Sequence, residues 1–292
     1  MKDLSSIIDN EYRKILAKEI PLAEYIPSEE MYISIIKSIR RRILFRRVVF
    51  VAAVVCPIVF LLYSAFYMHE NYGIFDKSRS EYLVESGCGD RVQTVFQDGS
   101  KVHLNAGSQL RYPDKFGIDS REVYLDGEAY FEISPDSKRP FVVNFSDGSV
   151  RVYGTKFNLK AYSGDEDFVV SLDEGSVKVS IAGSEYAMVP SDILVCNRKT
   201  GNVTVFHENN PAKNSIWRHN LISFRNGTVN QVFTQLSRIY GVDFVFQGDI
   251  PDYKFTFTTE KESLSHILSE LELISSLKFE RVNEKEVIVT NR

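Results

Sequence analysis

One stretch of the sequence, residues 48–68, reads VVFVAAVVCPIVFLLYSAFYM and carries no charge. As a helix it spans about 31 Å, which matches the roughly 30 Å hydrocarbon core of a bilayer. A signal peptide starts closer to the N-terminus and ends in small residues, whereas this stretch follows 47 residues and ends in bulky ones such as Tyr63, Phe66 and Tyr67. We therefore predict a retained transmembrane helix at residues 48–68.

Arginines on one flank predict how this helix is oriented. Residues 40–47 hold five arginines, whereas the ten residues after Met68 hold only Lys77 as a basic residue. Positively charged flanks stay on the cytoplasmic side, so we expect a cytoplasmic N-terminus and an external C-terminus. An arginine cluster is also typical of a solvated face or a nucleic-acid patch, but its position next to the span favours the topological interpretation.

The charge, histidines and cysteines of the parts before and after the span limit the kinds of partner and cofactor that we expect. The net charge is −4 over 292 residues; residues 1–47 contribute +3 (10 basic, 7 acidic) and the rest −7 (25 basic, 32 acidic). The acidic larger part argues against a direct nucleic-acid partner. The five histidines are scattered and no CxxC occurs, so we expect no metal site and no cofactor. Cys88 and Cys196 both lie beyond the span, which leaves a disulfide between them open.

The cytoplasmic piece, residues 1–47, is predicted to be helical. Apolar residues recur at helical spacing between residues 8 and 16, and a second helix is expected to start at Ser28 and to run towards the span. The apolar stripe of this second helix comprises Tyr32, Ile35, Ile36, Ile39 and Ile43. Two alternatives stay open: the stripes pack on each other or on the membrane, or they receive a partner helix.

Residues 81–206 are predicted to form an all-β domain. The hydrophobic period changes to 2, as in RVQTVFQDGSKVHLN around Asp98-Gly99, a strong hairpin signal. Similar segments surround three further dipeptides, Asp126-Gly127, Asp147-Gly148 and Glu174-Gly175. Their loose repeat predicts stacked hairpins or a short, twisted solenoid.

Nothing in this domain predicts an enzyme. The acidic residues of the predicted turns bond their own backbone next to glycines that supply a positive φ. The sequence contains no GxSxG, P-loop, dinucleotide fingerprint or HExxH.

The last segment, residues 214–292, is predicted to be a small α+β domain. Apolar periodicity gives the order β-α-β-β-α-β-β, in two related βαβ halves. Thr228 and Ser263 are the expected N-caps of the two helices, and Gly241 ends the first one. We expect Trp217 to anchor the preceding linker by packing.

Several motifs together carry a family resemblance. The segments DGSKVHLNAGS (98–108), REVYLDGEAYFEI (121–133), RPFVV (139–143) and VYGTKFNLKAY (152–162) occur in this order. This series resembles the FecR-like anti-sigma factors. The last domain is similar to the C-terminal domain of many such proteins, and hence to the signalling domains of TonB-dependent transporters and of secretins.

The resemblance implies a function in transcription regulation. FecR-like proteins lie in the inner membrane, with their larger part in the periplasm. There they receive a signal from the N-terminal signalling domain of a TonB-dependent outer-membrane transporter. Their cytoplasmic part binds an extracytoplasmic-function sigma factor. The resemblance also implies regulated proteolysis by membrane proteases, first outside and then within the span.

Two further hypotheses accompany this interpretation. Some FecR-like proteins split themselves at the bond that corresponds to Gly154-Thr155, where the threonine hydroxyl attacks the preceding carbonyl. The alternative function is a membrane-anchored periplasmic binding or assembly module that works through its last domain without sigma-factor control. An anchored glycan hydrolase is a more distant alternative.

Overall fold

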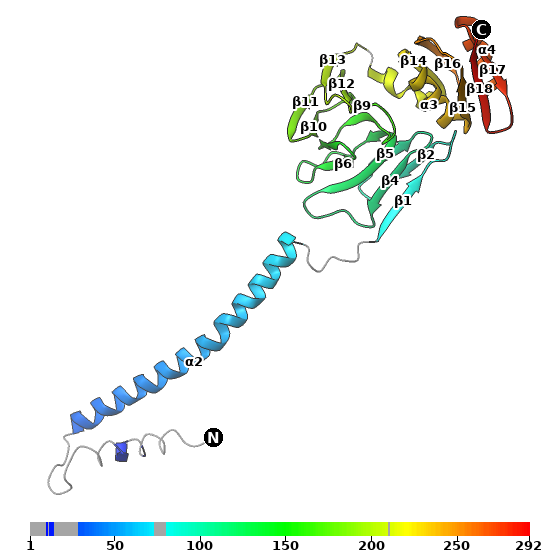
Figure 1. Ribbon diagram of the computed structural model, residues 1–292. Coiled ribbons are helices and arrows are strands. Elements are labelled where there is room, and N and C mark those ends of the chain that lie inside the picture. Colours follow the sequence, from blue (N-terminus) through cyan, green and yellow to red (C-terminus); the bar gives the residue numbers. More distant parts are fainter. Residues whose placement is uncertain (1–9, 11, 15–28, 73–79, 210) are drawn as a thin grey trace. The chain divides into compact units, whose positions relative to one another are not determined.

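The computed structural model describes residues 10, 12–14, 29–72, 80–209 and 211–292 (Figure 1). The chain divides into two compact units, Met1–Ser78 and Arg79–Arg292. In the first unit, residues 10 and 12–14 are helical, while the rest of the first predicted cytoplasmic helix lies outside the described residues.

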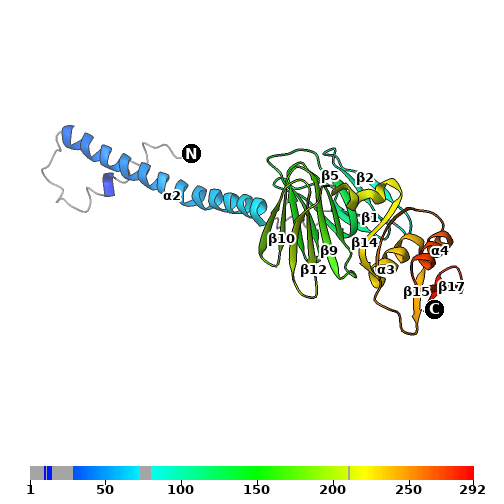
Figure 2. The same cartoon turned by 90° about the horizontal axis from the view of Figure 1, so that it is seen from above.

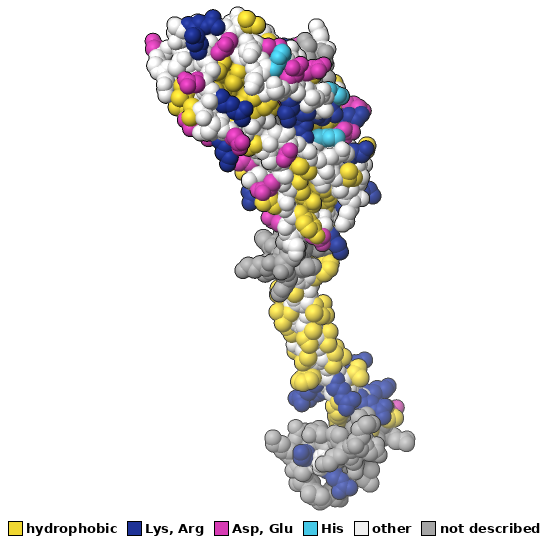
Figure 3. All heavy atoms as spheres, turned by 90° about the vertical axis from the view of Figure 1, so that its right-hand side faces the viewer, with side chains coloured by type: hydrophobic (Ala, Val, Ile, Leu, Met, Phe, Trp, Pro, Cys, Tyr) yellow, Lys and Arg dark blue, Asp and Glu magenta, His cyan; other side chains and the backbone are white. Residues whose placement is uncertain are grey.

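A single long helix, α2 (Glu29–Tyr72), contains both the second predicted cytoplasmic helix and the predicted span. Pro57 lies inside α2 without ending it. Its stretch Ile33–Tyr67 is long and apolar enough to cross a membrane, and none of its most apolar part is buried. Figure 3 shows apolar side chains covering this helix, with Lys and Arg side chains gathered at one end of the apolar stretch. The helix is therefore a candidate membrane span.

Thirteen strands form the β domain (β1 to β13), in one hydrogen-bonded sheet that curls into two layers (Figures 1 and 2). The first layer has the order β1-β4-β5-β6-β7-β10-β11 and the second the order β2-β3-β5-β8-β9-β12-β13. Besides β5, the first layer consists of β1 (Glu81–Glu85), β4 (Gln109–Pro113), β6 (Phe141–Phe145), β7 (Gly148–Val152), β10 (Val177–Ile181) and β11 (Ser184–Met188). The second consists of β2 (Val92–Val95), β3 (Lys101–Leu104), β8 (Lys156–Ala161), β9 (Asp167–Glu174), β12 (Asp192–Asn197) and β13 (Val203–His207).

Strand β5 (Arg121–Glu132) belongs to both layers. Its first half pairs with β4 and, in parallel, with β6, whereas its second half pairs with β3 and β8. Side chains alternate along it: Val123, Leu125 and Phe131 enter the core between the layers, while Glu128 and Tyr130 point to the opposite face. The all-β prediction is thus confirmed, but the arrangement is a curled two-layer sheet and not a solenoid.

Two of the four predicted hairpins are confirmed. Asp98-Gly99 lies in the turn between β2 and β3, and Asp147 lies in the turn between β6 and β7, where Gly148 is the first residue of β7. The hairpin at Asp126-Gly127 is wrong, because both residues lie within β5. Gly127 has a φ of +132°, and an added Cβ would lie 2.4 Å from that of Ser108. Gly127 therefore allows the connection that precedes β4 to pass close to the β5 backbone, instead of forming a turn.

The hairpin at Glu174-Gly175 is also wrong. The strand before it, β9, pairs with β8 and β12, whereas the strand after it, β10, pairs with β7 and β11. The chain therefore crosses from the second layer to the first at this point. Period-2 alternation is the same for a strand that returns beside its predecessor and for one that changes layer, so the sequence pattern did not distinguish them.

The C-terminal domain (β14 to β18) has the predicted order β-α-β-β-α-β-β. A short 3-10 helix, η1 (Pro211–His219), precedes β14 (Leu221–Thr228), α3 (Val229–Tyr240), β15 (Asp243–Gln247), β16 (Lys254–Glu260), α4 (Leu264–Ile274), β17 (Leu277–Arg281) and β18 (Glu286–Asn291). Strands β14 and β16 form one small sheet, and β15, β18 and β17 form another. Both helices contribute to the core of this domain, chiefly through Val232, Phe233 and Leu236 of α3 and Ile267 and Leu271 of α4.

The predicted helix caps are confirmed. Thr228 forms a capping box with Gln231 at the start of α3, and Gly241 ends that helix with a φ of +66°. The Ser263 side chain accepts a hydrogen bond from the His266 amide at the start of α4.

A buried arginine in the β domain adds an interaction that the turn prediction missed. Arg121 is fully buried and donates to Asp98 Oδ2 at 2.7 Å and to the carbonyls of Ser134 and Arg139. Asp98 also accepts from the Ser100 amide, as expected of a turn aspartate. One carboxylate therefore shapes the turn and neutralises a buried cation.

We predict that Arg121→Met destabilises the β domain by about 3–5 kcal/mol, because it leaves the Asp98 charge and two carbonyls without their donor. Urea unfolding of residues 79–292, followed by circular dichroism, measures this change. The control is Lys178→Ala, which removes an exposed ion pair with Glu185 and should cost less than about 1 kcal/mol. Equal losses in both variants would contradict the role of Arg121.

Candidate functional site

The C-terminal domain packs on the face of the second layer that points away from the core. A series of hydrogen bonds crosses the contact. The Glu128 carboxylate accepts from the side-chain amides of Asn105 (2.8 Å) and Asn158 (2.9 Å). Asn158 Oδ1 in turn accepts from Trp217 Nε1 (3.2 Å). Glu128, Asn158 and Trp217 are all buried. The predicted role of Trp217 as a packed anchor is confirmed, and its partner is a polar ladder on β5 and β8.

A second contact joins α3 to the loop between β8 and β9. Both terminal nitrogens of Arg238 donate to the Asp165 carboxylate, Nη1 at 3.1 Å, and Lys160 lies 3.7 Å from the same group. The Arg238 guanidinium also lies 3.8 Å from the centre of the Tyr162 ring. Since Arg238 and Asp165 are mostly shielded from water, this bidentate pair fixes the orientation of α3 more firmly than a surface ion pair would.

A third contact places Arg218 of η1 over β5. Its guanidinium lies 3.5 Å from the centre of the Tyr130 ring, and Tyr130 donates to Asp173 Oδ2 at 2.9 Å. Burial raises the pKa of the Asp173 carboxyl, and burial also raises the pKa of the Tyr130 hydroxyl. Asp173 Oδ1 and Arg218 Nε are buried without a hydrogen-bond partner. This third contact therefore leaves some of its buried polar atoms without hydrogen-bond partners, unlike the other two.

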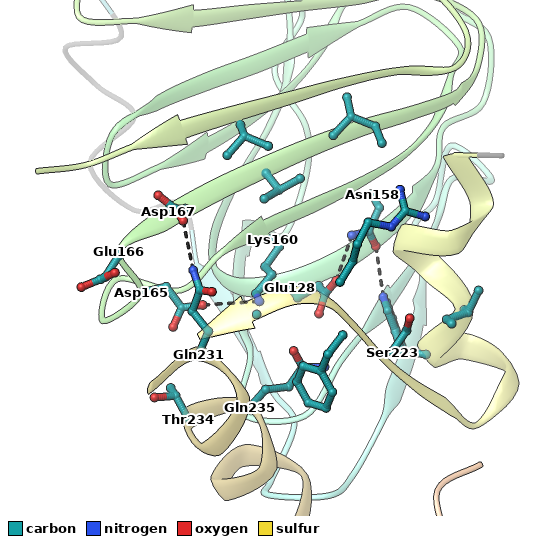
Figure 4. A pocket seen from close by; sticks show the side chains of 18 of the residues that line it. Glu128, Asn158, Lys160, Asp165, Glu166, Asp167, Ser223, Gln231, Thr234 and Gln235 are labelled. Carbon is teal, nitrogen blue, oxygen red and sulfur yellow. Dashed lines mark hydrogen bonds and ion pairs between the residues drawn. The ribbon is translucent and has the colours of Figure 1, made fainter. Parts of the chain in front are cut away.

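A cleft of about 330 Å³ opens along the same contact (Figure 4). Its floor is apolar and is formed by Val169, Ile193, Val195 and Phe206 of β9, β12 and β13. Its opposite wall comes from β14 and α3, where Gln231 reaches across to Asp167 at 3.2 Å. Glu128, Lys160 and Asp165 add polar groups to its lining. The cleft exists only while the two domains are in contact, so its shape reports their relative position.

The residues at this contact suit binding and positioning. They form ion pairs, amide ladders and cation-π contacts, each of which orients one domain on the other. Within the described ranges, no group of three or more His, Cys, Asp or Glu side chains is arranged to hold a metal ion. All three cysteines are free, and Cys196 is buried while Cys88 is exposed, so the structure has no Cys88–Cys196 disulfide.

The predicted self-cleavage site lies away from this contact, between β7 and β8. Gly154 approaches the backbone of Pro135 so closely that an added Cβ would lie 2.8 Å from the Pro135 Cα. Thr155 is buried, and its hydroxyl donates to the Ser176 carbonyl at 3.0 Å. This bond orients the hydroxyl without deprotonating it, because a carbonyl oxygen is not a base at neutral pH.

The C-terminal domain also exposes apolar side chains and unpaired strand edges. Its three-stranded sheet has the order β15-β18-β17, so β15 and β17 each have a free edge within the described chain. Val245 and Phe246 on β15 are each 40% exposed, and Leu273 at the end of α4 is 86% exposed. Free edges and exposed apolar side chains are typical of surfaces that receive another protein.

Comparison with known families identifies both domains. The family described as "FecR protein" matches residues 82–178, and the family described as "FecR, C-terminal" matches residues 221–289. The chain belongs to the FecR family of anti-sigma factors. The matched ranges meet at the contact described above, so the candidate site of this FecR-family chain is formed by its two matched domains together.

Two solved structures resemble this FecR-family chain. A crystal structure at 1.65 Å resolution, described as that of "a putative anti-sigma factor" from Parabacteroides distasonis ATCC 8503, is 27% identical with a TM-score of 0.69. The match covers 72% of this chain and 99% of that chain. A second structure with the same description, at 2.50 Å, has the same identity and TM-score and covers 73% and 100%. A comparison with curated proteins finds no match.

The contact between the domains predicts a fluorescence change in Arg238→Ala. Trp217 is the only tryptophan and is buried at the contact, so its emission reports on domain separation. Loss of the Arg238–Asp165 pair should weaken the contact by about 1.5–3 kcal/mol, and the Trp217 emission should shift to the red at a lower urea concentration. The control is Arg281→Ala, because Arg281 donates only to carbonyls of its own hairpin. An unchanged Trp217 transition in Arg238→Ala would contradict the role of this pair.

Self-cleavage at Gly154-Thr155 stays a prediction. It requires that the purified chain separates into two fragments on a denaturing gel, with a new N-terminus at Thr155, and that Thr155→Ala abolishes the split. Gly154 must remain in both samples, since its close contact with Pro135 tolerates no side chain. An intact chain that behaves like Thr155→Ala would rule the reaction out.

Proposed function

We propose that this protein is an inner-membrane regulator that relays a signal from a TonB-dependent outer-membrane transporter to an extracytoplasmic-function sigma factor. One observation carries the proposal: a candidate membrane span separates both FecR-family domains from a short N-terminal piece. A protein built in this way has one surface on each side of a membrane and one covalent path between them.

Charge supports the proposed orientation. The arginines of residues 40–47 lie in α2 immediately before its uncharged stretch, residues 48–68. Basic flanks remain in the cytoplasm, which puts residues 1–47 inside and residues from about 69 onward in the periplasm. In that orientation the apolar stripe of residues 32–43 is available to a sigma factor, as a helix that packs on a partner.

The C-terminal domain is the proposed receiver of the signal. Its exposed Phe246 and Leu273 and its free strand edges provide the kind of surface on which another small α+β domain can dock. We propose the N-terminal signalling domain of the transporter as this partner. The contact with the β domain then carries the consequence of binding toward the membrane.

Regulated proteolysis is the proposed output. A single helix transmits small displacements poorly, whereas cleavage outside and then within the span releases the N-terminal piece together with its sigma factor. Pro57 removes one helical hydrogen bond inside α2, and this favours local unwinding. We expect membrane proteases to act on a substrate that has first been exposed on the periplasmic side.

A co-purification experiment tests the proposal. The full chain, with an affinity tag after Arg292, is isolated from detergent-solubilised membranes, and mass spectrometry identifies the proteins bound to it. We expect an extracytoplasmic-function sigma factor in the purified sample, because the N-terminal piece carries a helical apolar stripe that we propose as its binding surface.

The matched control lacks residues 2–38 and keeps the arginines of residues 40–47, so its membrane orientation is preserved. It should recover no sigma factor. If the full chain also recovers none, the alternative of a membrane-anchored binding or assembly module without sigma-factor control is favoured.

A further inference from the structure

A short segment, Ser86–Arg91, joins β1 to β2 along the chain and contacts the C-terminal domain through hydrogen bonds. On one side it is bonded within the β domain: the Ser86 amide donates to the Ser108 carbonyl (2.9 Å), and the Gly107 amide donates to the Gly87 carbonyl (3.2 Å). The Ser108 amide returns a bond to Ser86 Oγ at 2.9 Å. These bonds continue the pairing of β1 with β4 by two residues.

On its other side the same segment binds the C-terminal domain. The Gly89 amide donates to the Arg238 carbonyl at 2.9 Å, and Lys261 Nζ donates to the Gly89 carbonyl at 2.7 Å. The Arg238 carbonyl belongs to the last turn of α3, where carbonyls lack a partner within the helix. Arg91 adds a bond to Asn220 Oδ1 at 3.4 Å. Both backbone polar groups of Gly89, its N–H and its C=O, are therefore satisfied by the C-terminal domain.

The segment and the end of α3 approach each other closely at two glycines. Gly89 has a φ of +77°, and an added Cβ would lie 2.7 Å from the Ile239 carbonyl oxygen. From the opposite side, a Cβ on Gly241 would lie 3.2 Å from the Cβ of Cys88. Two glycines thus allow the backbones to touch, and a shift of α3 cannot be absorbed by a flexible side chain.

Apart from the bonds of this segment, few contacts hold strand β1 in the sheet. It pairs only with β4 and forms the edge of its layer. Tyr82 and Leu83 are about half exposed, and Val84 is the β1 side chain that packs against the core. Edge strands with few buried contacts open at low free-energy cost, so the bonds of Ser86–Arg91 contribute a large share of what keeps β1 in place.

We propose that Ser86–Arg91 is a relay that couples the position of the C-terminal domain to the attachment of β1. While α3 is docked, the segment is clamped and β1 stays in the sheet. When a partner displaces α3, the segment loses its acceptor at Arg238 and β1 detaches. Residues 80–91, which follow the candidate span along the chain, then become an extended protease substrate. This inference rests on the proposed function and specifies how its signal reaches the membrane side.

Hydrogen exchange of the full chain in detergent, measured by mass spectrometry, tests the relay with Gly89→Ala. The new methyl group collides with the Ile239 carbonyl, so the amides of residues 81–85 should exchange at least about tenfold faster than in the unmodified chain. The matched control is Gly183→Ala, since Gly183 has a similar φ of +83° but nothing within 4 Å of an added Cβ. It should leave β1 exchange unchanged. Unchanged exchange in Gly89→Ala, or equal acceleration in both variants, would overturn the proposal.

An engineered disulfide, called the staple below, should have the opposite effect to Gly89→Ala, because it fixes the segment to α3. In Gly241→Cys the new Cβ lies slightly closer to that of Cys88 than the separation of about 3.5–4.5 Å in disulfides, so oxidation should join the segment to the end of α3. The oxidised staple should slow β1 exchange and protect residues 80–91 from added protease, and reduction should reverse both effects. Gly241→Ser, which has the same backbone cost but no thiol, should not respond to oxidant. Identical β1 exchange in the oxidised and reduced staple would overturn the relay.

These measurements do not depend on a sigma factor. A chain that recovers no sigma factor but shows the expected exchange would retain the relay and lose the proposed output. A chain that binds a sigma factor but shows no coupling at β1 would retain the proposed output and lose the relay.

Discussion

Strand β5 is the constraint on which the rest of the larger unit depends. Because its two halves pair in different layers, its inward side chains unite the core, and its outward Glu128 and Tyr130 form the surface on which the C-terminal domain rests. The hydrogen bonds from Glu128 through Asn158 to Trp217 exist only because β5 and β8 are neighbours. The fold and the contact between the domains are therefore parts of one arrangement.

The sequence predicted the structure well where the determining interaction is local. Thr228, Gly241 and Ser263 act within a few residues of themselves, and the Asp98-Gly99 turn is closed by a bond two residues along the chain. It failed at Gly127 because the need for glycine there comes from a close contact with Ser108, the residue that precedes β4. A dipeptide that favours a turn also suits a strand that must pass close to a second backbone, and the local pattern is the same in both cases.

The candidate site was predicted less completely than the fold, for the same reason. Trp217 was expected to pack, but its partner Asn158 is 59 positions away, and Arg238 and Asp165 are 73 positions apart. Alternation identifies Asn158 and Glu128 only as residues on the face opposite to the core. That this face is covered by a second domain follows from tertiary packing, which the alternation of a single strand does not encode.

The central claim is that a signal received by the C-terminal domain is passed to β1 through its contact with the β domain. The most direct measurement is amide exchange of the full chain in lipid nanodiscs, before and after addition of the purified signalling domain of the proposed partner transporter. The account predicts that exchange changes at α3 and also at residues 81–85, which the partner does not have to touch. Exchange changes restricted to the C-terminal domain, with β1 unaltered at saturating partner, would contradict it.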